Sequence, residues 1–428
     1  MTLTVFLVSL LGAMALGVPI AFALLICGVA LMWQLDMFDA QILAQNVING
    51  ADSFPLLAVP FFMLAGEIMN AGGLSRRIVA LAMALVGHVR GGLGYVAILA
   101  ACIMAALSGS AVADAAALGA LLLPMMIAAG HDKARSAGLI ASAGIIAPVI
   151  PPSIAFVVFG VAGNVSITRL FLAGVVPGLL LGLALWLTWW WLSRRERITP
   201  PPRKSRAEVK AALRDATWAL VLPFIIIFGL KFGVFTPTEA AVVAAVYALF
   251  ISLFVYRELD LRSLLPLFVA ASRTSAVIML LVAASMVTAW LITVAQLPGQ
   301  VVSLLEPLLD NPKLLLVAIM LLVMLVGTAL DLTPTILLLT PVLMPVVKAA
   351  GIDPVYFGVL FVINNAIGLI TPPVGTVLNT VAGVGKVSLD QVTRGVLPFM
   401  CAQFAVLFLL VLFPDLVMVP ARWLYGGH

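Results

Sequence analysis

Two stretches of the chain, Ala147-Pro-Val-Ile-Pro-Pro-Ser153 and Gly368-Leu-Ile-Thr-Pro-Pro-Val374, carry paired prolines inside long apolar runs. Proline has no backbone N–H, and its ring clashes with the carbonyl group one turn earlier, so each pair predicts a break in a helix. A single break would be explained as well by a simple kink. Two breaks at matching places in two halves of a chain are typical of the binding site of a membrane transporter.

The composition predicts an all-α polytopic membrane protein. Hydrophobic residues make up 64% of the chain and charged residues 10%, and the mean hydropathy is +1.22. Because a spanning helix needs about 20 apolar residues, the chain has room for roughly ten crossings and some shorter pieces. The first apolar run, Leu3 to Trp33, lacks a basic start, so we expect membrane structure there and no signal peptide.

The second half of the chain repeats the first. At one constant shift, prolines and glycines of the two halves coincide: Pro124 with Pro345, Gly130 with Gly351, Pro151 and Pro152 with Pro372 and Pro373, Gly174 with Gly395, and Pro177 with Pro398. We therefore predict two repeats, residues 1–192 and 215–428.

The segment 193–214 is a basic linker between the repeats. Its cations are Arg194, Arg195, Arg197, Arg203, Lys204, Arg206, Lys210 and Arg214. Because loops rich in lysine and arginine stay on the cytoplasmic side, we expect this linker to be cytoplasmic. The tryptophans that precede it, ending at Trp191, are typical of a helix that leaves the membrane.

Charges near the helix ends predict that the repeats are inverted. The flanks of residues 93–128 carry arginine and lysine, whereas their counterparts in the second half carry a balanced or acidic set. The apolar runs 92–127 and 314–347 are both interrupted by small polar residues. We predict two re-entrant helical hairpins whose tips meet near the midplane, followed by broken helices at about 137–163 and 354–385.

Oxygen atoms at the tips and breaks predict two sodium sites. A hard cation prefers oxygen ligands, and backbone carbonyls with hydroxyls supply them without a full charge. The first predicted site comprises Ser108, Ser110 and the carbonyls of Ala147, Ile150 and Pro152. The second comprises Gly327, Thr328, Asp331, the carbonyls of Gly368 and Pro373, and the Thr371 hydroxyl. Asp331 could either bind sodium or hold the loop.

An anionic substrate is expected between the two sites. Helix N-termini at Ser153 and Val374 would point positive dipole ends at it. Arg273 lies about ten residues into its span, near mid-depth, where it could face a carboxylate, pair with an acidic side chain or snorkel. Asn365 and Asn379 could bind a polar ligand or tie helices together.

Enzymatic and nucleotide-driven functions are not expected. The three histidines form no HExxH motif or Ser/His pairing, and no GxxxxGK[ST] motif is present. A passive channel needs a continuous pore, whereas two opposed hairpins suit alternating access. Glu67 and Glu239, near predicted helix ends, are expected to hold loops.

These motifs, in this order, resemble the large membrane subunit of tripartite ATP-independent periplasmic (TRAP) transporters, within the wider ion-transporter superfamily. The stretches that carry the resemblance are Phe54 to Met69, the Ser108 tip, Ile150 to Ile154, Gly351-Ile-Asp-Pro354 and Gly368 to Gly375. The resemblance spans almost the whole chain. Asp114 and Thr376 depart from the family pattern, and Thr376 is a further candidate for contact with substrate.

The resemblance implies a secondary active transporter of the bacterial inner membrane. It implies sodium-driven import of an organic acid anion, such as a dicarboxylate, keto acid or sugar acid, delivered by a periplasmic binding protein. It further implies a small four-helix membrane subunit and an elevator motion of a transport domain against a scaffold, with neither an organic cofactor nor a nucleic-acid partner. The alternative is a stand-alone sodium- or proton-coupled anion symporter of the same superfamily.

Overall fold

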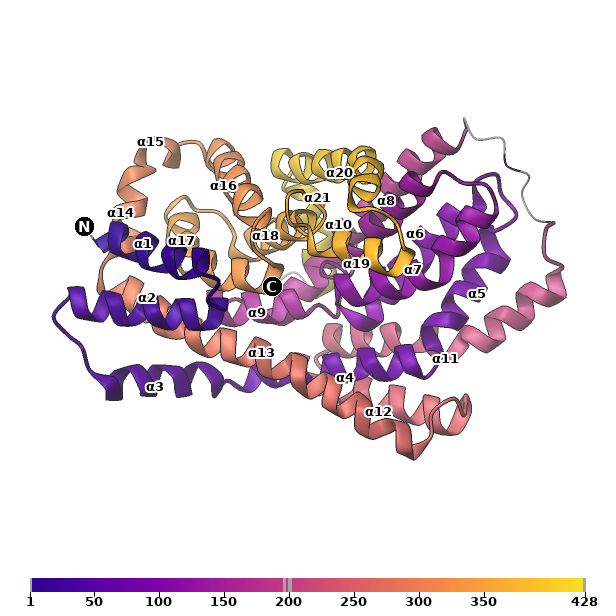
Figure 1. The fold of residues 1–428 in the computed structure, drawn as a ribbon, viewed down its shortest axis with the longest axis horizontal. Coiled ribbons are helices and arrows are strands. Elements are labelled where there is room, and N and C mark those ends of the chain that lie inside the picture. The colour runs from indigo at the N-terminus through magenta and orange to yellow at the C-terminus, as the bar shows by residue number, and fades with distance from the viewer. Residues whose placement is uncertain (1, 195–197, 199–201, 426–428) are drawn as a thin grey trace.

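The computed structural model describes residues 2–194, 198 and 202–425, and all regular structure in these residues is helical (Figure 1). The helices of the first half are α1 (Thr2–Ala15), α2 (Ile20–Gln34), α3 (Ala40–Ala51), η1 (Phe54–Leu57), α4 (Ala58–Ala71), α5 (Leu74–Val86), α6 (Gly92–Ser108), α7 (Ala111–Ala128), α8 (Lys133–Gly144), α9 (Ile154–Gly163) and α10 (Ile167–Ser193). Those of the second half are α11 (Arg206–Lys231), α12 (Pro237–Phe250), η2 (Ile251–Val255), α13 (Leu261–Val294), α14 (Leu297–Leu304), α15 (Glu306–Leu309), α16 (Pro312–Gly327), α17 (Leu332–Ala349), α18 (Pro354–Gly368), α19 (Thr376–Gly385), α20 (Leu389–Leu412) and α21 (Asp415–Tyr425).

The helix lengths confirm a polytopic membrane protein. Within the described residues, eight helical segments are long and apolar enough to cross a membrane. The shorter apolar helices, of 10–17 residues, include both first arms of the predicted hairpins and three of the four halves of the broken helices. The predicted interruptions are therefore real ends of helices.

The helices around the tips and breaks repeat in the same order in both halves. The paired helices α6 and α7 precede the broken pair α8 and α9, and α16 and α17 precede α18 and α19. Helix α8 begins at Lys133, before the predicted start at 137, because the Asp132 side chain caps it by accepting a hydrogen bond from the Arg135 N–H at 2.8 Å. The peptide bonds Pro151–Pro152 and Pro372–Pro373 are both cis.

Helices of the first half pack against helices of the second half in two equivalent places. Helix α7 packs against α19 of the second half, and α17 packs against α9 of the first. The long helix α13 runs beneath both groups in the view of Figure 1, and it contacts α2, α3 and α4. The same contact thus occurs twice with the halves exchanged, as a two-fold relation between repeats would produce. The inverted orientation in the membrane stays a prediction.

The second part of the predicted linker is helical. Helix α11 begins at Arg206 because Ser205 and Glu208 form a capping box, in which the Ser205 N–H donates to the Glu208 carboxylate at 2.7 Å. The predicted linker residues 195–197 and 199–201 lie outside the described residues. A second capping box, between Thr236 and Glu239, begins α12 and confirms a structural role for Glu239.

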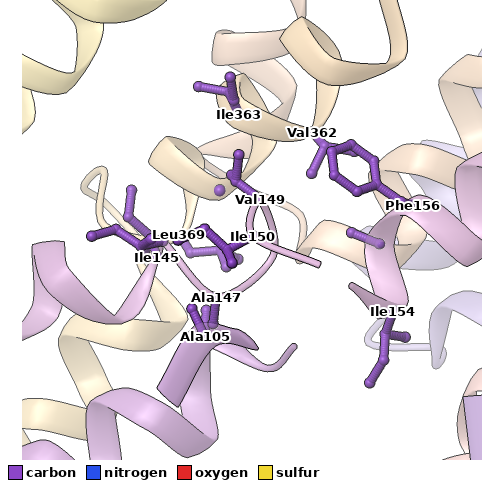
Figure 2. Close-up of a cluster of buried hydrophobic side chains, with 14 of the residues drawn as sticks. Ala105, Ile145, Ala147, Val149, Ile150, Ile154, Phe156, Val362, Ile363 and Leu369 are labelled. Carbon is purple, nitrogen blue, oxygen red and sulfur yellow. The ribbon is translucent and has the colours of Figure 1, made fainter. Parts of the chain in front are cut away.

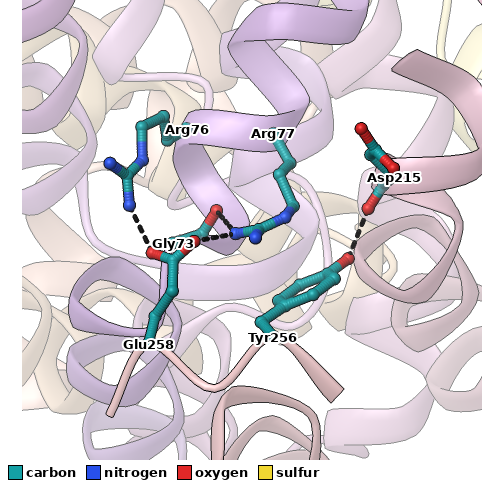
Figure 3. Close-up of polar contacts among 6 residues, drawn as sticks. All are labelled: Gly73, Arg76, Arg77, Asp215, Tyr256 and Glu258. Atoms are coloured by element: carbon teal, nitrogen blue, oxygen red, sulfur yellow. Dashed lines mark hydrogen bonds and ion pairs between the residues drawn. The ribbon is translucent and has the colours of Figure 1, made fainter. Parts of the chain in front are cut away.

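A polar cluster joins α5 to the loop before α13 and to α11 (Figure 3). Glu258 forms ion pairs with Arg76 and with Arg77, the second at 2.6 Å. The Arg77 guanidinium also lies over the Tyr256 ring, 3.7 Å from its centroid. Burial raises the pKa of the Tyr256 hydroxyl, against the lowering effect of Arg77, so this group stays protonated and donates to the Asp215 carbonyl at 2.7 Å.

We expect Glu258→Gln to lower the free energy of unfolding by about 1–3 kcal/mol, because two guanidinium groups lose a charged hydrogen-bond partner. Thermal unfolding of the purified chain measures the change. The control is Asp390→Asn, which removes an exposed pair with Arg394, with side chains 68% and 76% exposed, worth about 1 kcal/mol at most. Equal shifts in the two variants would show that the cluster contributes no more than a surface pair.

Candidate functional site

The first hairpin tip lies directly against the first break. Ser108 ends α6, Ser110 caps α7, and Gly109 between them has a φ of +62°, which favours glycine. A Cβ atom on Gly109 would lie 2.6 Å from the Pro152 carbonyl oxygen. Only glycine therefore allows this tip to reach the break, and the predicted neighbours Ser108, Ser110 and Pro152 are brought together.

The polar atoms of this first site are mostly oxygens. The Ser108 hydroxyl donates to Asp114 Oδ1 at 2.5 Å and accepts from the Ser110 N–H at 3.2 Å. Among the hydrogen bonds of the described residues, none has the carbonyl oxygen of Ala147, Ile150 or Pro152 as its acceptor. The oxygen atoms predicted to bind sodium are thus available.

Asp114 is a component of the site that the sequence interpretation missed. The residue is 1% exposed, and its second oxygen, Oδ2, has no hydrogen-bond partner in the described part of the chain. The sequence interpretation treated it only as a departure from a family pattern. The signal that could have found it is its spacing, since four residues after Ser110 is one helical turn from the tip.

Ser153 lies at the N-terminus of the half-helix after the first break, as predicted, and its hydroxyl is engaged by the protein. Its hydroxyl donates to the Pro148 carbonyl at 2.5 Å and accepts from the Phe156 N–H at 3.2 Å, so it closes the break and caps α9. The residue is fully buried. In this structure Ser153 therefore supports the break, and its contact with substrate stays a prediction.

The second tip lies equally close to the second break. A Cβ atom on Gly368 would lie 2.9 Å from the Gly327 carbonyl oxygen. Asn365 Oδ1 is buried without a partner in the described residues, and it would lie 3.7 Å from a Cβ on Gly327. The Asp331 side chain caps α17 and accepts a hydrogen bond from the Thr376 hydroxyl at 3.4 Å. Tip and break are thus linked through both backbone and side chains.

Other predicted residues of the second half bond locally. The Thr371 hydroxyl donates to the Ile367 carbonyl at 2.8 Å, and the Thr328 hydroxyl donates to the Leu325 carbonyl at 2.7 Å. The Asn379 amide donates to the Val374 carbonyl at 2.7 Å. Pro373 and Val374 are exposed beside them. These hydroxyl oxygens keep lone pairs that a cation could use.

The helices that flank the two breaks contact each other, α8 with α19 and α9 with α18. Ile145, Ala147 and Ile150 of the first break share one buried apolar cluster with Leu369 of the second (Figure 2). Arg273 is exposed on α13, and no hydrogen bond or ion pair in the described residues connects it to either break. Its predicted contact with substrate is therefore not supported by a contact here and stays a prediction.

The donor atoms fit a hard monovalent cation. Within the described residues, no group of three or more His, Cys, Asp or Glu side chains could hold a metal ion. Carbonyl and hydroxyl oxygens, with one carboxylate near each tip, are the ligands that sodium and similar hard cations accept. Transition-metal chemistry has no ligand set at this place.

Comparison with known proteins decides the family. The family described as "Tripartite ATP-independent periplasmic transporter, DctM component" matches residues 7–416. The chain belongs to this family. Its membership in the DctM family confirms the predicted large membrane subunit of a TRAP transporter, a multi-pass membrane protein that is a transporter and not an enzyme.

Two relatives of this DctM-family chain match it along its length. It is 56% identical over 424 residues to the 2,3-diketo-L-gulonate TRAP transporter large permease protein YiaN of Escherichia coli, covering 99% of this chain and 100% of that one. It is 57% identical, with the same coverage, to a putative TRAP transporter large permease protein of Haemophilus influenzae. The solved YdaH transporter of Alcanivorax borkumensis shares the fold, with a TM-score of 0.65, 15% identity and 91% coverage of both chains.

Proposed function

We propose that this chain imports an organic acid anion, driven by a sodium gradient, together with a small four-helix membrane subunit and a periplasmic binding protein that delivers the substrate. We place it in the bacterial inner membrane with segment 193–214 on the cytoplasmic side. One observation carries the proposal. The same arrangement occurs twice, a small polar hairpin tip packed on a Pro-Pro break. Among the described residues, no hydrogen bond is accepted by the carbonyl oxygens of Ala147, Ile150 and Pro152 at the first break or of Pro373 at the second, whereas the Gly368 carbonyl accepts one from the Thr371 N–H at 3.0 Å.

Sodium is the coupling ion that this arrangement favours. The oxygen atoms proposed to bind sodium are neutral carbonyl and hydroxyl oxygens. The carboxyl groups of Asp114 and Asp331 lie beside the two tips, where they would offset the charge of bound cations. With both sites filled, the tips and breaks move as one charge-compensated unit. Moving such a unit across the membrane in an elevator motion avoids exposing unpaired charge to lipid.

The substrate class that we propose is a sugar acid or keto sugar acid. The support is the relative named for 2,3-diketo-L-gulonate, which is 56% identical over nearly the full chain. The half-helix that starts at Thr376 points its positive end toward the breaks, and Thr376 and Asn379 offer polar groups there. Arg273 stays a candidate for binding the carboxylate of the substrate in the substrate-bound conformation.

We expect sodium to raise the unfolding temperature of the purified chain, relative to equal potassium or choline, because a ligand of the native state stabilises it by about 2.7 kcal/mol at 100 times its Kd. Ser110→Ala and Thr371→Ala should each reduce the rise. Thr293→Ala is the control, since that hydroxyl bonds only its own helix on an exposed face. Equal rises in unfolding temperature in all variants would mean that the Ser110 and Thr371 hydroxyls are wrongly assigned to the sodium sites.

Uptake into proteoliposomes tests the tripartite assignment. We expect sodium-driven uptake of a sugar acid only when the small subunit and the binding protein are both present. Uptake by the chain alone would instead support a stand-alone symporter. Uptake that follows a proton gradient and ignores sodium would contradict the coupling ion proposed here.

A further inference from the structure

A cavity of about 580 Å³ lies between the end of α5 and the start of α11, away from the tips and breaks. Four exposed cations line the cavity and are called its rim: Arg203, Lys204, Arg206 and Lys210. Its wall includes Leu85 and Leu213, which are 44% and 48% exposed. The cavity therefore joins a strongly basic rim to an apolar wall.

Most of the positive charge of the rim has no acidic partner among the described residues. Lys204 pairs with Glu208 at 2.8 Å, but in the described residues no acidic side chain pairs with Arg203, Arg206 or Lys210. His88 lines the same cavity, and its Nδ1 atom is buried without a hydrogen-bond partner in the described part of the chain. An anion with several acceptor oxygens would satisfy these groups together.

The cavity lies close to the end of α10, where the chain reaches the membrane surface. The Arg90 guanidinium, just after His88, donates to the Arg194 carbonyl at 2.9 Å. Beside it, Trp190 and Trp191 are 45% and 55% exposed, as tryptophans are where a helix meets lipid headgroups. The rim therefore lies at headgroup depth.

Helix α11 places the cavity at the end of a candidate membrane span. It is long and apolar enough to cross a membrane, and Arg206 and Lys210 lie in its first two turns. Leu213 follows Lys210 by about one turn. The apolar wall therefore lies further along the span than the cations do.

We propose that this cavity binds an anionic phospholipid, with the phosphate held by Arg203, Arg206 and Lys210 and an acyl chain lying along Leu85 and Leu213. The combination of rim and wall favours a lipid, because a free phosphate ion would use the cations alone. Basic pockets at the ends of membrane helices bind anionic headgroups in this way. The bound lipid bridges α5 to α11, the first helix of the second half, and this site is independent of sodium coupling.

The test is thermal unfolding of the detergent-purified chain, titrated with phosphatidylglycerol or with phosphatidylcholine of the same acyl chains. We expect a saturable rise in unfolding temperature with phosphatidylglycerol alone. Arg206→Gln/Lys210→Gln should weaken the apparent affinity at least tenfold. Both side chains are exposed, so the variant should fold. The matched control Arg257→Gln/Arg262→Gln removes one cation from the loop before α13 and one from the first turn of α13, and it should keep the affinity.

Three outcomes would overturn the proposal. An equal rise with phosphatidylcholine would reflect general lipid solvation. Glycerol phosphate, which has no acyl chain, acting as well as phosphatidylglycerol would make this a site for a soluble phosphate. An unchanged affinity in Arg206→Gln/Lys210→Gln would place the lipid elsewhere. None of these measurements depends on uptake. The lipid site can therefore be disproved without affecting the proposed transport function, and the transport function can be disproved without affecting the lipid site.

Discussion

Gly368→Ala is expected to reduce sodium-driven uptake at least tenfold. The added Cβ atom would lie 2.9 Å from the carbonyl oxygen of Gly327 and 3.0 Å from its carbonyl carbon. Both are backbone atoms, which cannot rotate away as a side chain does, so the second tip must move off the second break. In a tightly packed interior such a shift is felt by the whole contact. Initial rates in proteoliposomes with all three components measure the loss.

Gly383→Ala is the matched control for this substitution. Gly383 lies in α19 of the same broken segment, and a Cβ atom there would meet nothing within 4 Å. Alanine should be tolerated or slightly stabilising there, since glycine inside a helix costs about 0.5–1 kcal/mol. Gly327→Ala should lie between the two, because its Cβ would be 3.5 Å from Gly368 Cα. Wild-type uptake by Gly368→Ala would show that the tip need not touch the break.

The places where the helices stop could be predicted because their causes are local. Pro148 and Pro372 each stand four residues after the end of a helix, at Gly144 for α8 and Gly368 for α18, where a proline ring blocks continuation. The glycine and serine residues at 108–110 end α6. The capping box that starts α11 at Ser205 was equally visible in the sequence, as Ser-x-x-Glu, but was interpreted as part of a linker.

The directions of side chains could not be predicted in the same way. The depth of Arg273 in the membrane can be estimated by counting residues along its helix. The face of the helix on which Arg273 lies depends instead on how distant helices pack around α13. The Ser153 hydroxyl bonds the Pro148 carbonyl only because the break folds back. Asn365 meets Gly327 only because α18 packs on α16. These contacts depend on tertiary structure, so no local sequence pattern predicts them.

Asp114→Asn is expected to raise the sodium concentration for half-maximal uptake about tenfold, equivalent to roughly 1.4 kcal/mol of binding free energy. At present the carboxylate accepts the Ser108 hydroxyl hydrogen at 2.5 Å, which leaves a lone pair of the Ser108 oxygen for a cation. An amide at this place can instead donate to that oxygen and compete with sodium. The substitution also removes a buried carboxylate oxygen beside the site.

The sodium dependence separates this positioning role from a merely structural one. Asp310→Asn, which changes an exposed carboxylate before α16, should leave the half-saturating sodium concentration unchanged. Ser108→Ala/Asp114→Asn should cost less than the sum of the two single substitutions, because neighbours that act through one hydrogen bond are not additive. If Asp114→Asn lowers the maximal rate but keeps the wild-type sodium dependence, the carboxylate supports the hairpin without presenting Ser108 to the cation. Additive single effects would lead to the same conclusion, since the two side chains would then act on transport separately.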